Sequence, residues 1–303
     1  MAYLMIAMAA LMWGTIGFFV KGLSAAGFSA IDIVAIRVGT AAVLLLLIGF
    51  LFYREYLKIK IKHLPLFLGT GLLSIVFFNW CYFTAIEKMN IPVAAALLYT
   101  SPAFVITLSA LFLKEGVNLR KIMAVFGTVV GAAMVAGIHL NQDLSFPATS
   151  IFIGLGAGLG YALYSIFGKV ALQSYHPFTL TLYTFLVAAI FLVPSFFASY
   201  KPTVQVSGDV IIYAVSLGLF PTVMAYFAYS WGLEKVESSQ AAIVATIEPV
   251  TATFLGIFMF AERITLMQSL GIVFILSSVL LVNISKRDFT GKKEKNNWSA
   301  LSK

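Results

Sequence analysis

Ten long apolar runs follow one another in the sequence, and charged segments or segments rich in Gly and Pro separate them. A run of about 20 apolar residues can cross a lipid bilayer as a helix. Helices are expected because a bilayer offers no partners for backbone N–H and C=O groups. We expect an all-α membrane protein with ten transmembrane helices, at 3–20, 30–52, 65–87, 92–113, 121–138, 150–171, 178–198, 210–233, 239–260 and 267–284.

The composition favours a membrane protein without a further soluble domain. Of the 303 residues, 61% are hydrophobic and 11% are charged, whereas soluble domains carry roughly 25% charged residues. The run at 1–20 has no basic segment before it, so we interpret it as a span rather than a signal peptide. The net charge of +8 lies mainly in loops and the tail, where membrane orientation accounts for it. We therefore expect no nucleic-acid partner.

Two stretches of the chain resemble each other at a spacing of 147 residues. They run over 87–119 and 234–266, and each contains a polar turn, an apolar run with one proline and an acidic end. A self-match at a fixed spacing indicates an internal duplication. We expect a first five-helix repeat at 1–140, a second at 147–287 and a basic, disordered cytoplasmic tail at 288–303.

An odd number of spans in each half predicts that the second half enters the membrane upside down. Proteins with such inverted repeats are typically transporters, and they hold the substrate near the midplane between the repeats. With the amino terminus inside, fifteen Lys and Arg residues lie in inner segments, and the outer segments hold only Lys21, Lys88, Lys201 and Arg263. The positive-inside rule therefore places both termini in the cytoplasm.

Several short motifs resemble the EamA family of the drug/metabolite transporter superfamily. They are WGTIGFFVKGL at 13–23, GTVVGAAMVAG at 127–137 and the paired segment ends LFLKEGVNL and FMFAERITL. The resemblance covers about 1–287 and implies a ten-helix bundle that carries small metabolites, often amino acids or related compounds, commonly outward. One departure concerns helix packing: GIVFILSSVLLV in the last span lacks the second glycine of the first-half version.

Two charged residues, Arg37 and Glu248, lie well inside predicted spans rather than near their ends. A charge there costs roughly 2.5–3.5 kcal/mol or more unless it faces a cavity or a partner. Glu248 lies near the midplane, and Ser101 is its equivalent in the first half. We predict that Glu248 contacts the substrate or a proton; a structural ion pair or support of Pro249 is the alternative. Arg37 either reaches the outer interface with its long side chain or lines the cavity opposite Glu248.

Aromatic residues also lie inside spans, although Trp and Tyr normally gather at the membrane interfaces. Such rings can line a pocket for organic molecules through stacking or cation–π contacts, with plain packing as the alternative for each ring. We predict that the substrate-binding residues are Arg37 and Glu248 together with Trp13, Asn79, Tyr82, Tyr99, Tyr161, Tyr164, Tyr226 and Tyr229.

Residues at equivalent positions in the two halves are candidates for hinges, helix caps and gates. Pro102 and Pro249 each remove a backbone hydrogen bond from a span, so we predict hinges there, with static kinks as the alternative. Glu115 and Glu262 end their spans, where we expect them to cap or orient the helical hairpins. Lys21 and Lys169 lie at corresponding span ends; interface anchoring is the expected role and gating the alternative.

These observations favour a secondary transporter of amino-acid-like or aromatic zwitterions, because Arg37 and Glu248 together suit a zwitterion. We expect it to be an exporter that works by alternating access. The alternative is an importer of an amine cation such as choline, held by an aromatic cage and Glu248. A passive channel remains a distant alternative. A membrane-embedded enzyme is disfavoured because the sequence has no HExxH or G-x-S-x-G motif. We expect no cofactor and no metal; protons are a candidate partner, and a monomer suffices.

Overall fold

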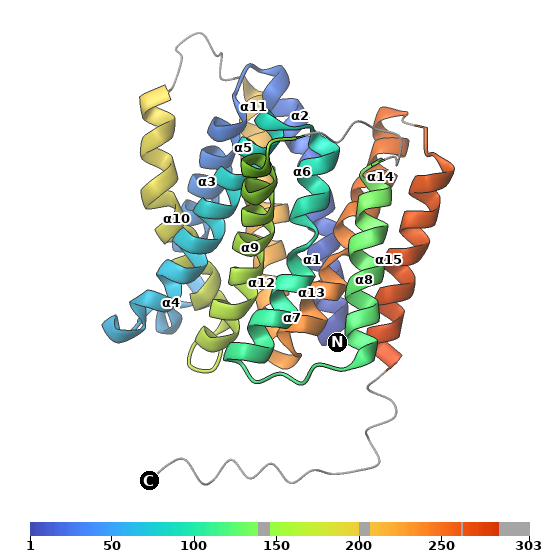
Figure 1. The fold of residues 1–303 in the computed structure, drawn as a ribbon. Helices are drawn as coiled ribbons and strands as arrows, with labels where there is room; N and C mark the ends of the chain where they lie inside the picture. Colours follow the sequence, from blue (N-terminus) through green and yellow to red (C-terminus); the bar gives the residue numbers. More distant parts are fainter. Residues whose placement is uncertain (139–145, 200–206, 262, 285–303) are drawn as a thin grey trace, which may run out of the picture.

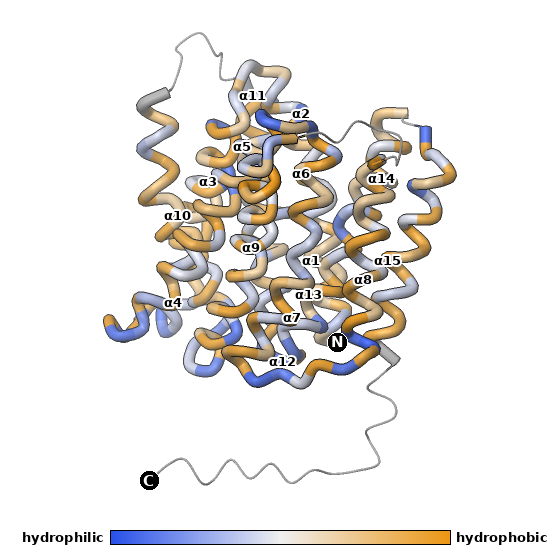
Figure 2. The backbone as a smooth tube through the Cα atoms, viewed as in Figure 1, coloured by the Kyte–Doolittle hydropathy of each residue, from blue (hydrophilic) through white to orange (hydrophobic). Residues whose placement is uncertain are grey.

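A computed structural model of the chain describes residues 1–138, 146–199, 207–261 and 263–284. Across these residues every regular element is a helix, and the helices stand side by side in one bundle (Figure 1). Eight helices in the described part are long and apolar enough to cross a membrane, and Leu266–Val282 is a shorter apolar helix. Apolar residues cover most of the length of the bundle, and hydrophilic ones gather at its ends (Figure 2). The predicted all-α membrane fold is confirmed; the predicted tail at 288–303, Lys201 and Glu262 lie outside the described residues.

The first half of the chain builds its long helices from shorter pieces joined end to end. Its elements are α1 (Ala2–Gly14), α2 (Ile16–Ala25), α3 (Ala30–Phe52), η1 (Arg54–Leu57), η2 (Ile61–His63), α4 (Leu64–Leu68), the π-helical η3 (Gly69–Val76), α5 (Phe77–Lys88), α6 (Ile91–Leu98), α7 (Ser101–Phe112) and α8 (Leu119–Val135). Short interruptions between α1 and α2, and between α6 and α7, leave each pair as one rod.

The second half repeats the same order of pieces. Its elements are α9 (Ala148–Ala171), α10 (Pro177–Ser199), α11 (Gly208–Gly218), the π-helical η4 (Leu219–Met224), α12 (Ala225–Lys235), α13 (Ser238–Ala245), α14 (Ile247–Phe260) and α15 (Leu266–Ile284). A π-helical segment precedes both α5 and α12, and a break separates both α6 from α7 and α13 from α14. The predicted spans at 121–138 and 267–284 correspond to α8 and α15.

Polar side chains set several helix starts, as expected where a chain turns at a membrane surface. Ser29 and Asp32 form a reciprocal capping box at the start of α3. The side chains of Asn90 and Asn118 each accept a hydrogen bond from a backbone N–H in the first turn of α6 and α8. These caps fix the helix boundaries close to where the sequence places them.

Helices of one half pack mainly against helices of the other half. The principal pairs are α8 with α15, α3 with α10, α5 with α9 and α1 with α12. A Cβ added to Gly131 would lie 2.7 Å from the carbonyl oxygen of Gly271, and one added to Gly271 would lie 2.6 Å from that of Gly131. Gly127 faces the hydroxyl of Ser278. A single glycine in α15 therefore suffices for close packing, because the two glycines of α8 supply the remaining space.

The bundle has two ends, which we name from the start of α1. At the amino-terminal face, the Tyr3 hydroxyl donates to Gln240 Oε1 on α13 at 2.6 Å. Lys169, near the end of α9, donates to the Val236 carbonyl at the same turn at 2.7 Å. Since α1 begins and α9 ends at this face, the two helices run in opposite directions (Figure 1). The opposite face holds Lys21 and the α5–α6 turn.

Candidate functional site

Aromatic side chains from three helices meet in the interior of the bundle. Trp13 of α1 lies at the centre of this aromatic cluster, with its ring centroid 5.1 Å from those of Tyr226 and Tyr229 of α12. Tyr161 of α9 approaches Trp13 from another side at 6.1 Å, and Tyr164 lies 5.1 Å from Tyr226. The structure thus brings five of the predicted residues together, and most of the rings meet edge to face or tilted, as aromatic pairs prefer.

Hydroxyl groups fix two of these rings. Tyr164 Oη lies 2.7 Å from Ser230 Oγ, and Tyr229 Oη lies 2.7 Å from Ser165 Oγ. The two hydrogen bonds are reciprocal. In the first, the tyrosine lies on α9 and the serine on α12; in the second, the tyrosine lies on α12 and the serine on α9. Sequence reasoning missed Ser165 and Ser230, since serine inside an apolar span has many roles.

Only a small cavity remains between the rings. Its volume is about 10 Å³, and its walls include Ser74, Ile75 and Phe78 besides the aromatic cluster and Ser165. A cavity of this size has room for about one water molecule. An organic substrate would therefore need the helices around the cluster to move apart.

Glu248 joins the cluster through Tyr161, whose hydroxyl donates to Glu248 Oε2 at 3.2 Å. The carboxylate lies at the second residue of α14 rather than inside a continuous helix, because the rod is interrupted at Thr246. The start of a helix carries a partial positive charge from its unpaired N–H groups, which stabilises a nearby carboxylate. A broken helix whose amino-terminal end points into the membrane interior is a common way to bind ions and substrates.

Arg37 is buried, with 7% of its surface exposed, so its side chain does not reach the outer interface. Its Nη2 lies 3.5 Å from Asn79 Oδ1, which is a long and weak contact, and its Nε has no hydrogen-bond partner. Asn79 is itself held by a 2.7 Å hydrogen bond from Nδ2 to the Ile75 carbonyl in η3. Trp13 Nε1 is a second buried donor without a partner. Donors left unpaired in this way cost about 1–3 kcal/mol each.

Arg37 and Glu248 act on each other electrostatically but are not paired. Each contributes to the electrostatic environment of the other, and the described residues show no ion pair of either within 4.0 Å. A buried cation and a partly buried carboxylate thus lie near one aromatic cluster, and each retains hydrogen-bonding capacity that no residue of the described part uses. This arrangement can bind a molecule with both charges.

Tyr82 and Tyr99 lie outside the aromatic cluster. Tyr82 stacks on Phe78 with ring centroids 5.9 Å apart, and Phe78 in turn lies 5.8 Å from Tyr161. Tyr99 lies at the break between α6 and α7 and packs against a separate group of buried residues that includes Val250. Both tyrosines lie within electrostatic reach of Glu248, so they form an outer layer of the candidate site.

Pro102 and Pro249 occupy the first turns of α7 and α14. The N–H groups of a first turn have no partner within the helix, so a proline there breaks no hydrogen bond. The sequence-based reason for a kink is therefore corrected: each proline starts a new helix after an interruption. Thr100 Oγ1 donates to the Leu97 carbonyl and Thr246 Oγ1 to the Ile243 carbonyl, both at 2.6 Å.

The π-helical segments η3 and η4 are a feature that the sequence pattern did not reveal. Each precedes the helix that carries a predicted site residue, Asn79 on α5 and Tyr226 on α12. A π-helical stretch re-aims the side chains that follow it and occurs often at functional sites. The only sequence signals for them are Gly69 and Gly71 in η3 and Pro221 in η4, all common in membrane helices for other reasons.

Two histidines lie apart from the candidate site, at the amino-terminal face. His63 Nδ1 contacts the Tyr175 hydroxyl at 2.8 Å. His176 stacks on Tyr56 with ring centroids 4.2 Å apart, and burial lowers the pKa of its imidazole. Among the described residues, no group of three or more His, Cys, Asp and Glu side chains could hold a metal ion.

Comparison with known proteins relates the whole chain to membrane transporters. A family model described as the EamA-like transporter family matches residues 1–137 and 148–284. An uncharacterized transporter from Archaeoglobus fulgidus is 30% identical over 214 residues, which are 69% of this chain and 75% of that protein. The uncharacterized transporter YxxF from Bacillus subtilis is 24% identical over 212 residues, which are 69% of this chain and 67% of that protein. A solved crystal structure superimposes with a TM-score of 0.80 at 15% identity, over 95% of this chain and 98% of the other, and so has the same fold.

Proposed function

Because this chain belongs to the EamA-like transporter family, we propose that it is a secondary transporter that moves amino-acid-like or aromatic zwitterions out of the cell by alternating access. The membrane location and the transport of a small molecule follow from the family. The substrate, the direction and the mechanism are the proposal. Its substrate site is the aromatic cluster with Arg37 on one side and Glu248 on the other.

The proposed architecture has ten spans in two inverted five-helix repeats, at 1–140 and 147–287, with both termini in the cytoplasm. The packing pairs support this arrangement: exchanging the halves turns the pair α1–α12 into α9–α5, which is also a principal pair. The opposite directions of α1 and α9 support the inversion (Figure 1). The excess of Lys and Arg in the segments at the amino-terminal face supports the orientation.

The unpaired charges at the aromatic cluster carry the proposal for the substrate. Within the described part of the chain, Glu248 accepts a single 3.2 Å hydrogen bond, from Tyr161, and so retains capacity for an ammonium group. Arg37 Nε is buried without a partner and is a natural ligand for a carboxylate. The rings around Trp13 suit an apolar or aromatic side chain. Since Glu248 can also bind a proton, proton coupling belongs to the proposal.

The site opens, in this proposal, at the interruptions between α6 and α7 and between α13 and α14. Tyr99 and Thr246 are equivalent positions in the two halves, and both lie at these breaks. Pro102 and Pro249 start the helices that would tilt. A cavity of about 10 Å³ is far too small for an amino acid, so tilting of these helices is required for binding.

Import of an amine cation such as choline is the second candidate function. The observation in its favour is the group of rings around Trp13, since aromatic rings attract quaternary ammonium groups. Buried Arg37 argues against it, because a cation near the site repels a cationic substrate. The two candidates therefore differ in what removal of Arg37 does to transport.

The experiment is uptake of a labelled panel of amino acids and choline-like amines into proteoliposomes, with and without an imposed pH gradient. We expect saturable amino-acid transport by the wild type and its loss in Glu248→Gln, with the exposed Glu234→Gln as the matched control. Accumulation that follows the pH gradient would establish proton coupling. Transport of amines alone would overturn the zwitterion proposal, and non-saturable flux would indicate a channel.

A further inference from the structure

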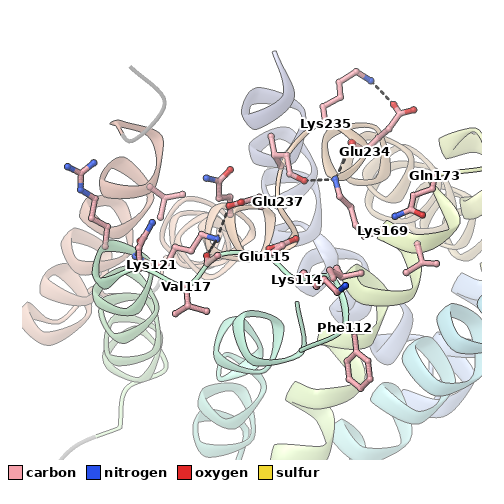
Figure 3. A pocket seen from close by; sticks show the side chains of 18 residues that line it. Phe112, Lys114, Glu115, Val117, Lys121, Lys169, Gln173, Glu234, Lys235 and Glu237 are labelled. Carbon is pink, nitrogen blue, oxygen red and sulfur yellow. Dashed lines mark hydrogen bonds and ion pairs between the residues drawn. The ribbon is translucent and has the colours of Figure 1, made fainter. Parts of the chain in front are cut away.

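The turn between α12 and α13 is held tightly at the amino-terminal face (Figure 3). Lys169 of α9 donates to the carbonyls of Leu233 at 2.7 Å, Glu234 at 3.1 Å and Val236 at 2.7 Å. These three bonds use all three N–H groups of the ammonium. They also place a positive charge at the carboxyl end of α12, where the helix dipole favours it.

Two residues of the first half bind the same turn from across the bundle. The Glu115 carboxylate accepts hydrogen bonds from the backbone N–H groups of Ser238 at 2.6 Å and Ser239 at 3.1 Å, and from the Ser239 hydroxyl at 2.8 Å. A residue outside the helix thus caps α13. Lys121 of α8 pairs with Glu237 at 2.7 Å, and the cation is buried. We call Glu115, Lys121 and Lys169 the latch.

The latch borders a cavity of about 1120 Å³ that is rich in cationic residues. Two of these cations, Lys121 and Lys169, are engaged by the protein itself rather than left for an anionic ligand. Lys169 is saturated by three carbonyls, and Lys121 binds both Glu237 and the Gly116 carbonyl at 2.6 Å. The contacts of Glu115 and Lys121 join the two halves of the chain, so they act on the relative position of the halves, whereas Lys169 holds the turn from within the second half.

The duplication shows what the opposite face has at the equivalent positions. Gln268 is the counterpart of Lys121, and Asn90 is the counterpart of Glu237, so neither member of the equivalent pair is charged. The counterpart of Ser239 is Pro92, which has no backbone N–H to donate. Asn90 caps α6 with its own side chain instead, by accepting from Val93 N at 2.9 Å.

The fourth counterpart is Lys21, which matches Lys169. Its Nζ lies over the ring of Phe260 at 3.5 Å from the centroid. By analogy with Lys169, it would bind the carbonyls at the carboxyl end of α5 when the opposite face closes. Lys21 therefore has an alternative partner. The sequence keeps a glutamate, Glu262, at the position equivalent to Glu115, but it removes the ion pair and one of the two backbone N–H donors of the cap from the opposite face.

From this asymmetry we infer that the latch biases the transporter toward the conformation closed at the amino-terminal face, with Glu115 as its central positioning residue. The inference rests on the proposed alternating access. Under the proposed orientation, the resting protein is closed to the cytoplasm and releases outward more readily than it opens inward. A substrate must supply binding energy to break the latch, because only differential affinity shifts such an equilibrium.

The test measures the reactivity of single cysteines toward a maleimide in purified, substrate-free protein carrying Cys81→Ser. Ala242→Cys reports on the amino-terminal side, where Ala242 of α13 is buried against α7 and α9. Ala95→Cys, at the equivalent position of the first half, reports on the other side. We expect Glu115→Gln to raise labelling at position 242 about tenfold and to lower it at position 95. Glu234→Gln, which pairs only with its neighbour Lys235, should change neither.

A gain-of-function variant keeps the inference falsifiable if Glu115→Gln is poorly folded. Gln268→Lys together with Asn90→Glu would build the missing ion pair on the opposite face. We expect labelling to fall at position 95 and to rise at position 242. Unchanged labelling in both variants, or a rise at position 242 without a fall at position 95, would overturn the inference. Labelling needs no substrate, so its outcome is independent of the substrate proposal; labelling that rises by the same factor at both positions in one variant would refute alternating access itself.

Discussion

Among the described residues, the buried side chains of Arg37 and Lys121 should respond oppositely to the same substitution. Arg37 and Lys121 have 7% and 5% of their surface exposed. Lys121 makes a 2.7 Å ion pair and a 2.6 Å hydrogen bond, whereas Arg37 has an unpaired Nε and one contact at 3.5 Å. Methionine is unbranched and flexible like both side chains, is somewhat shorter than either, and carries no charge.

The magnitude follows from these contacts. A buried donor without a partner costs about 1–3 kcal/mol, so Arg37→Met should stabilise the substrate-free protein by roughly that amount. Lys121→Met should destabilise it by about 1–3 kcal/mol or more, because Glu237 and the Gly116 carbonyl lose their partner. Transport should nevertheless be lost in Arg37→Met, since the residue is retained for the substrate rather than for the fold.

The assay is thermal or denaturant unfolding of both variants in the same detergent, followed by uptake in proteoliposomes. A raised midpoint together with lost transport for Arg37→Met is the expected result. Equal destabilisation by Arg37→Met and Lys121→Met would refute the reasoning, because it would mean that Arg37 is as well paired as Lys121.

Two further predictions concern packing and ring orientation. Gly131→Ala should destabilise the protein by about 1–3 kcal/mol in an unfolding assay, because the new Cβ would lie 2.7 Å from the Gly271 carbonyl oxygen. The control is Gly17→Ala, whose new Cβ would have nothing within 4 Å and which should be neutral or stabilising. A similar loss of stability in both variants would contradict the close contact at Gly131. Ser165→Ala should raise KM for transport several-fold by freeing the Tyr229 ring, with Ser165→Thr restoring it; an unchanged KM in Ser165→Ala would show that this hydrogen bond does not orient the ring.

The overall fold could be predicted because bilayer crossing imposes a strong pattern on the sequence. Apolar runs of the required length located the long helices, and the motifs around Trp13 and Gly127 identified the family, which the family match over 1–137 and 148–284 confirms. The aromatic cluster also followed from sequence, since Trp13 and Tyr161 occupy equivalent positions in spans that the duplication aligns. Their contact requires only that these two spans approach each other.

The finer features of the site depend on backbone detail that hydrophobicity does not encode. Glu248 lies at a helix start because the helix is interrupted at Thr246. The hydrophobicity of the run does not indicate whether such an interruption is present. The environment of Arg37 depends on Asn79 and the π-helical η3 before it, which no residue pattern specifies. Glu115 was expected to cap a hairpin, but the helix it caps belongs to the other half.

The central claim is that Arg37 and Glu248 bind opposite ends of one zwitterion. The most direct measurement is exchange transport by wild type, Arg37→Met and Glu248→Gln with three forms of the preferred amino acid: the free zwitterion, its methyl ester and its N-acetyl derivative. We predict that the wild type prefers the zwitterion. Arg37→Met, which no longer transports the zwitterion, should carry the methyl ester, and Glu248→Gln, which has likewise lost zwitterion transport, should carry the N-acetyl form. The same order of preference in all three proteins would contradict the assignment of both residues.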